Sequence, residues 1–323
     1  MQRFFFKARH NVGKIKAIHA EGGNRRPLLS VEKKLEEPIM LKTFRVIFSL
    51  LLILGFSATL TGKEGVDTYF PHAIGSYWIY ADQDGNELTR RTAADKTVAG
   101  ETYHAFSYEP ALEDWADYDY HIYPNFCQVG EEWVTFLVAD DLKKAVEARL
   151  TREAEVFRKL LRTEGLDLLY NIELGTQDPL YVLPISITAN KQWDATRIKA
   201  KVTMRPDPPQ DPVEVTLDFT IVETGKVLGT ENVETPAGTF KDCLKIEYRT
   251  KTEVASFPPA PEGELHPSGE SITTLWVAPN IGIVKFHREM EDVLLKAIPR
   301  PQLKASITTK TLELKRYEIQ SAN

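Results

Sequence analysis

The sequence has few of the residues that mark a disulfide scaffold or a membrane span. Only two of its 323 residues are cysteines, Cys127 and Cys243, which is too few to hold a small domain together. A bridge between them stays open, because its geometry cannot be judged from sequence. The longest uncharged apolar run, residues 46–60, is shorter than the roughly 20 residues that a membrane-spanning helix needs.

Motifs for common enzyme chemistries are also missing. The chain has no HExxH, GxSxG, CxxC, GxGxxG or P-loop pattern, and its seven histidines are scattered. A triad built from distant segments stays open, since such sites are defined by geometry and not by order in the chain. The sequence therefore favours a non-enzymatic protein that uses no cofactor.

The apolar run 46–60 follows Lys42 and Arg45 and precedes small residues, which is typical of a secretory signal peptide. We expect residues 40–62 to be that signal, cleaved near Gly62, with no membrane span left afterwards. The alternatives are an uncleaved anchor or a buried helix. Export places the protein in the periplasm if its source has an outer membrane, and outside the cell otherwise.

Residues 1–39 have no clear role in an exported protein. They carry nine basic and four acidic residues without regular periodicity. Because a signal peptide begins near its own methionine, we expect translation to start at Met40, with residues 1–39 either untranslated or a disordered leader. The rival interpretation is a basic arm that binds nucleic acid or membrane.

The remaining part, residues 63–323, is expected to form a single β-rich domain. It carries 29 basic and 42 acidic residues, a net charge of −13, which argues against a nucleic-acid partner. The stretches 198–204, 213–221 and 244–248 alternate apolar with polar residues, the pattern of strands with one buried face. Asp84, Gly85 and Asn86 indicate a hairpin turn.

One segment has helical spacing instead. Apolar residues recur every three or four positions over 142–161, which predicts a helix over about 141–163, capped by Asp140 or Asp141 and ended at Gly165. Its solvent-facing side would carry Arg149, Arg152, Glu153 and Arg158. Together these patterns predict a mainly β fold: a long-stranded, curved antiparallel sheet or open barrel with one amphipathic helix packed on it.

Four stretches show a resemblance to a known group. They are YFPHAIGSYWIYADQDG (69–85), TPAGTFKDCLKIEY (235–248), TLWVAPNIGIVKF (274–286) and LELKRYEI (312–319). They resemble uncharacterised secreted bacterial β-proteins of the open half-barrel group, which includes the periplasmic lipoprotein carriers. The resemblance covers about half of the exported part, implies an apolar or lipid ligand, and brings no catalytic residues.

Two candidate sites follow. If the concave face of the sheet binds a hydrophobic or amphipathic ligand, inward residues of the long strands would line it: Leu217, Phe219, Leu244, Ile246, Val284 and Phe286. If 117–123 is a strand, Asp117, Asp119 and His121 share one face and could bind Zn²⁺ or Mn²⁺. A solvated strand face is the simpler interpretation of those three residues.

The sequence therefore leaves three functions open. The first is an exported, non-enzymatic envelope protein that binds a lipid or other apolar ligand, and we favour it. The second is a structural or assembly protein that acts through exposed strand edges. The third is a metal-dependent enzyme that uses Asp117, Asp119 and His121. The oligomeric state is not indicated by the sequence.

Overall fold

The computed structural model describes residues 65–66, 68–176, 180–207, 214–257, 269–298 and 302–321. The predictions for residues 1–62, and for the links at 208–213 and 258–268, lie outside the described residues. By its internal contacts the chain divides into Met1–Phe56 and Ser57–Asn323, and the fold below is that of the second unit. No helix in the described ranges combines the length and the apolar character that crossing a bilayer requires.

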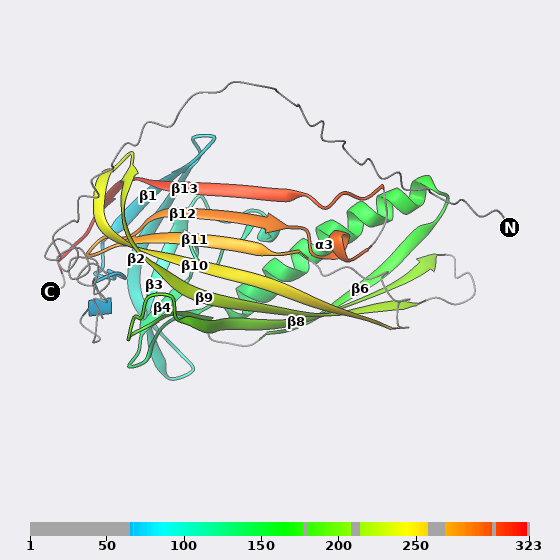
Figure 1. Ribbon diagram of the computed structural model, residues 1–323, viewed down its shortest axis with the longest axis horizontal. Helices are drawn as coiled ribbons and strands as arrows, with labels where there is room; N and C mark the ends of the chain where they lie inside the picture. Colours follow the sequence, from blue (N-terminus) through cyan, green and yellow to red (C-terminus); the bar gives the residue numbers. More distant parts are fainter. Residues whose placement is uncertain are drawn as a thin grey trace, which may run out of the picture. The chain divides into compact units, whose positions relative to one another are not determined.

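The described strands form one antiparallel sheet that does not close, as the sequence predicted (Figure 1). Neighbours in the sheet follow the order β6-β8-β9-β10-β11-β12-β13-β1-β2-β3-β4-β5-β7. The strands are β1 (Tyr77–Asp82), β2 (Glu87–Val98), β3 (Glu101–Glu109), β4 (Phe126–Val129), β5 (Trp133–Leu137), β6 (Asp167–Thr176), β7 (Leu180–Pro184), β8 (Gln192–Asp207), β9 (Val215–Thr235), β10 (Gly238–Phe257), β11 (Ser271–Ala278), β12 (Gly282–Glu291) and β13 (Ile307–Glu318).

The long strands β8, β9 and β10 form successive hairpins, in which Met204 pairs with Val215 and Gly238 with Thr235. The predicted turn between β1 and β2 is present, with Gly85 at a φ of 85° that favours glycine. In each of these strands the apolar residues of the alternating pattern face inward, because only that face is covered.

Two buried aromatic residues form hydrogen bonds between strands near the opposite ends of the sheet. Trp193 of β8 donates its indole N–H to the backbone oxygen of Tyr181 in β7, at 3.0 Å. Tyr248 of β10 donates its hydroxyl to the oxygen of Val182, also in β7, at 2.8 Å. Since β7 is the last strand in sheet order and β8 lies next to the first, the sheet must curl strongly for these contacts to form. Gly225 pairs with Trp193 and leaves space for its ring.

Helix α3 (Ala139–Thr163) confirms the predicted amphipathic helix. Its C-terminus is closed by Gly165, at a φ of 82°, and by a hydrogen bond from the Leu166 N–H to the Leu161 oxygen at 3.0 Å. The predicted cap at its start is wrong. Val138 takes that position without a side-chain hydrogen bond, and Asp140 and Asp141 lie in the first turn, where their charge favours the helix dipole.

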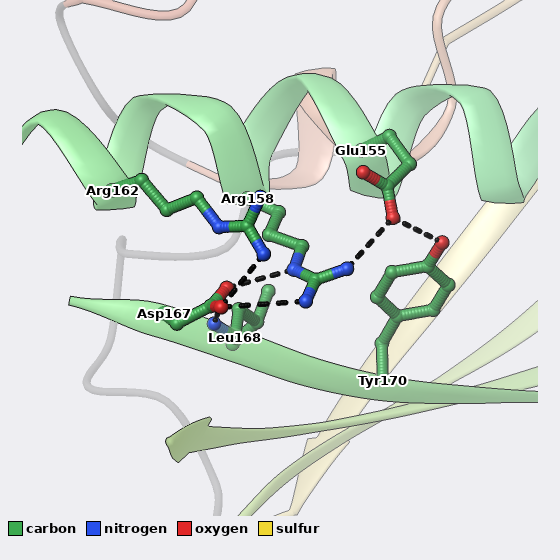
Figure 2. Close-up of polar contacts among 6 residues, drawn as sticks. All are labelled: Glu155, Arg158, Arg162, Asp167, Leu168 and Tyr170. Carbon is green, nitrogen blue, oxygen red and sulfur yellow. Dashed lines mark hydrogen bonds and ion pairs between the residues drawn. The ribbon is translucent and has the colours of Figure 1, made fainter. Parts of the chain in front are cut away.

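The outer side of α3 is tied to strand β6 by ion pairs and hydrogen bonds (Figure 2). Arg158 and Arg162 both contact the Asp167 carboxylate, at 2.7 and 2.8 Å, and Tyr170 donates its hydroxyl to Glu155 at 2.7 Å. These side chains are partly or well exposed to solvent. We call the five residues the outer cluster.

The opposite side of α3 faces the concave surface of the sheet (Figure 1). Two short helices pack against α3 as well: η1 (Trp115–Asp117) and α4 (Leu294–Ala297). Cys127 in β4 and Cys243 in β10 are both buried thiols, so the bridge that the sequence left open is not formed.

Candidate functional site

The six residues predicted to line a ligand-binding face lie in the close-packed core of the sheet. None is more than 3% exposed, and none lines the cavity described below. They are Leu217, Phe219, Leu244, Ile246, Val284 and Phe286. Their side chains are buried in this structure, and their role in ligand binding stays a prediction.

The predicted strand over 117–123 is wrong. The Asp114 carboxylate accepts the Ala116 N–H at 2.8 Å and starts η1, and the Asp119 backbone oxygen then accepts the N–H groups of Ile122 and Tyr123 in a turn. Asp117 therefore lies at the surface, paired with Arg152 at 3.1 Å, whereas Asp119 and His121 are buried. The three predicted metal ligands do not converge. Among the described residues, no three His, Cys, Asp or Glu side chains are placed to hold a metal ion.

The inward-facing rows of five neighbouring strands change from apolar to polar within one step of two residues of the same level, since Thr273 lies opposite Tyr248 and not opposite Thr250. In β9 the row Leu217, Phe219, Ile221 continues with Glu223, and in β12 Phe286 is followed by Arg288. β10, β11 and β13 change in the same way. We call these residues the polar belt: Glu223, Thr250, Thr273, Arg288 and Lys310.

The strand register brings the members of the belt next to one another. Thr250 pairs with Glu223, Thr273 pairs with Arg288, and Arg288 pairs with Lys310. Two cations directly opposite each other on adjacent strands repel, so the arrangement requires a negative charge between them.

Asp119 supplies that charge from the segment after η1. One carboxylate oxygen contacts the Arg288 guanidinium, and the other lies 3.2 Å from the Lys310 ammonium. Asp119 is only 2% exposed, so its charge is buried and must be paired. The turn that forms in place of the predicted strand therefore brings Asp119 into contact with two residues of the belt.

Glu223 is the second anion of the site. It accepts hydrogen bonds from Tyr120 and from Thr250, the latter at 3.0 Å, and lies 3.2 Å from the His121 ring nitrogen Nε2. Burial on its own would raise the pKa of Glu223, but His121 and these hydrogen bonds hold it below its ordinary value. Burial and the Glu223 charge raise the pKa of Tyr120 well above its usual range, so this tyrosine stays a donor. The His121 ring also packs against Tyr120 and Tyr248.

Helix α3 contributes Arg149 and Glu153, both of which the sequence pattern assigned to its solvent-facing side. Glu153 is 6% exposed and accepts the backbone N–H groups of Leu294 and Leu295 at 2.6 and 3.1 Å, which caps α4. Burial raises the pKa of Glu153 above its ordinary value. Arg149 is half-buried and makes no hydrogen bond or ion pair with the part of the chain that the structure describes.

These groups surround a cavity of about 60 Å³ between α3 and the concave face of the sheet. A water molecule needs roughly 10–15 Å³ of such space, so the cavity has room for a few waters or one small polar group. Its polar wall includes Asp119, His121, Arg149, Glu153 and Arg288. Its apolar wall includes Leu142, Val146, Leu150, Ile198 and Ile221.

The charges of the site are unequally satisfied. Asp119, Glu153 and Glu223 each have at least two partners. Among the described residues, by contrast, Arg149 has no hydrogen bond and Arg288 leaves its Nε without one. Asp119 Oδ2 and Glu223 Oε1 also have no hydrogen bond, but each lies 3.2 Å from a basic group, Lys310 and His121 respectively. Arg149 has no such contact within the described part of the chain, so it is the charge of the site that most needs a partner.

Residues 159–289 match the model of the DUF3108-like family. The matched range includes Glu223 and Arg288 but not Asp119, His121 or Arg149. No curated protein matches the chain.

Two solved structures resemble the chain. One is a protein of Parabacteroides distasonis provisionally named a lipoprotein, with 17% identity, a TM-score of 0.33, and coverage of 78% of this chain and 98% of its own. The other is a protein of Bacteroides fragilis provisionally named an exported protein with YmcC-like fold, with 14% identity, a TM-score of 0.31, and coverage of 77% and 98%. Neither name states an activity or a ligand.

The sequence analysis named Asp119 and His121 only as candidate metal ligands, and it missed Glu223, Arg288, Arg149 and Glu153. A signal for the first two was present, because each extends an inward apolar row by one step of two residues. No comparable signal existed for Arg149, whose helix has charges on several sides.

Proposed function

We propose that this protein is exported and binds a small amphipathic ligand, without catalysis, in the cavity between α3 and the concave face of the sheet. The observation that carries the proposal is the two-sided lining: charged groups on one wall and aliphatic side chains on the other. Binding sites that fix orientation combine an apolar lining with a few placed polar groups in this way. The small volume means that the polar end of the ligand enters the cavity first and that a longer apolar part must lie along or displace α3.

Two valines of the same helix provide the test. Val146 lines the cavity, whereas Val156 is 44% exposed. We expect the full-length wild type to bind at least one of dodecanoate, dodecyl phosphate and dodecanol with one-to-one stoichiometry in native mass spectrometry. Val146→Asp should abolish that binding, and Val156→Asp should leave it intact. Absence of binding by all three amphiphiles would refute the proposal.

The exported location rests on the sequence of residues 40–62. Expression of the full chain in a bacterium with an outer membrane should yield a processed protein in the periplasmic fraction whose N-terminus lies close to Lys63. Recovery of an unprocessed chain that begins at Met1 from the cytoplasm would contradict export.

A further inference from the structure

The proposed function does not specify the charge of the ligand's polar end. The hydrogen-bond partners of the charged residues around the cavity indicate which charge it carries. Asp119 is occupied by Arg288 and Lys310, Glu223 by Tyr120, Thr250 and His121, and Glu153 by two backbone N–H groups. A cationic head group would have to take a carboxylate away from these partners. It would do so in a wall that already holds Arg149 and Arg288.

Unlike these carboxylates, Arg149 has no partner among the described residues. Its side chain lines the cavity, is half-buried, and contacts no acceptor among the described residues. Burial, followed by the positive charge of Arg288, lowers the pKa of Arg149 below its ordinary value, so the charged form is under electrostatic strain. An incoming negative charge would relieve both the missing hydrogen bonds and this repulsion.

Arg288 provides the second guanidinium. It is 8% exposed, bound to Asp119 through one terminal nitrogen, and has no partner for its Nε in the described part of the chain. A planar guanidinium presents donors in a fork that matches the oxygens of a carboxylate or phosphate. The volume of about 60 Å³ suits a group of that size and not an acyl chain.

We propose that the cavity receives an oxyanion, the carboxylate or phosphate of its ligand, between the guanidinium groups of Arg149 and Arg288. The aliphatic wall formed by Leu142, Val146 and Ile221 then contacts the part of the ligand next to the oxyanion. The inference deepens the proposed function, because it specifies the head group of the amphipathic ligand.

The test on the full-length wild type compares ligands that share one chain and differ in their head group. Dodecanoate and dodecyl phosphate should bind at least about tenfold more tightly than dodecanol, a difference of roughly 1.4 kcal/mol, and dodecyltrimethylammonium should not bind. Equal affinity for dodecanol and the two acids would overturn the oxyanion and leave the proposed function standing. Inorganic phosphate that binds as tightly as dodecyl phosphate would support the oxyanion and refute the amphipathic ligand.

A matched pair of arginines on α3 assigns the effect to the site. Arg149→Met should weaken binding of dodecyl phosphate by about tenfold or more, because it removes the charged hydrogen-bond donors that the phosphate would contact. Arg149→Lys should restore part of it. Arg152 lies three residues further on, is paired with Asp114 and Asp117 at the surface, and does not line the cavity, so Arg152→Met should bind as wild type does. Unchanged binding by a folded Arg149→Met protein would overturn the assignment.

Discussion

Helix α3 carries charged groups on two sides, and they differ chiefly in their access to water. On the outer side, Arg158 and Arg162 meet Asp167 of β6 in solvent (Figure 2). On the inner side, Arg149 and Glu153 border a cavity together with the buried members of the polar belt. The residue types are alike, but an exposed ion pair replaces good hydration with a modest attraction, whereas a buried charge has lost its hydration entirely.

That difference separates structural from functional charge in this molecule. Every charge of the outer cluster has a partner, so the cluster needs nothing further and serves to hold α3 on β6. On the inner side, Arg149 has no partner among the described residues, and single atoms of Arg288, Asp119 and Glu223 have no hydrogen bond. A fold that accepts such a cost retains it more readily at a binding site than in a plain core. The predictions below test this contrast from its largest consequence to its smallest.

Glu223→Ala should have the largest effect on stability. The substitution leaves His121, Tyr120 and Thr250 without their common acceptor in a buried site, and removal of one partner from a buried charged pair costs about 3–5 kcal/mol. Urea unfolding measures the loss. Glu253→Ala, at an exposed position of β10, is the control and should change the unfolding free energy by less than about 0.5 kcal/mol.

The same residue gives a pH dependence. The pKa of Glu223 is lowered in the folded protein, so its contribution to stability is present at neutral pH and is lost as the pH falls below its ordinary value of 4.5. Glu223→Gln should remove that part of the acid sensitivity. A wild type and a Glu223→Gln variant that lose stability in parallel on acidification would show that the pKa of Glu223 is not lowered in the folded state.

Glu153→Ala should have an intermediate effect. The substitution leaves the N–H groups of Leu294 and Leu295, at the start of α4, without an acceptor, and each buried unsatisfied donor costs about 1–3 kcal/mol. It also removes the desolvation cost of the carboxylate, which offsets part of this loss. We expect a net loss of about 2 kcal/mol in urea unfolding. Glu153→Gln, whose amide oxygen still accepts, should recover most of this loss.

The sign of the pH effect at Glu153 is opposite to that at Glu223. Because burial raises its folded pKa, Glu153 contributes most stability below pH 4.5 and loses that contribution as the pH rises through the folded pKa. Relative to Glu153→Gln, the wild type should therefore become less stable as the pH rises from about 4 toward neutrality. The reverse trend would show that the carboxylate is better stabilised than its burial suggests.

The sequence was sufficient for the architecture but not for the site. Alternation in β8, β9 and β10 and the helical spacing of α3 are local patterns, and they predicted an open antiparallel sheet with one helix. The failure at 117–123 was also local. A single Asp114 side chain starts η1 there, and the competing turn chemistry has no strong sequence signal against an alternating background.

The site depends on information that no local pattern contains. Asp119 contacts Arg288 and Lys310 across more than half the length of the chain, and Glu223 contacts His121 from a strand about a hundred residues away. The register of β9 against β10, and of β11 against β12 and β13, decides which inward polar residues share a level. Inward rows that turn polar are visible in sequence, but their alignment is a property of the folded sheet.

Asp167→Asn, on the outer side of α3, should lower the free energy of unfolding least among these substitutions. Hydrogen bonds from Arg162 and Arg158 lower the pKa of Asp167, so its contribution is present at neutral pH and declines as the pH falls below its ordinary value of 3.8. Because the pair is exposed, 1 M salt should screen most of the difference between wild type and variant in urea unfolding, as the Debye length falls to about 3 Å. Salt should leave the Glu223→Ala difference almost unchanged, since that site is buried. If the loss at Asp167 matched that at Glu223, or resisted salt equally, burial would not be what distinguishes the two sides of α3.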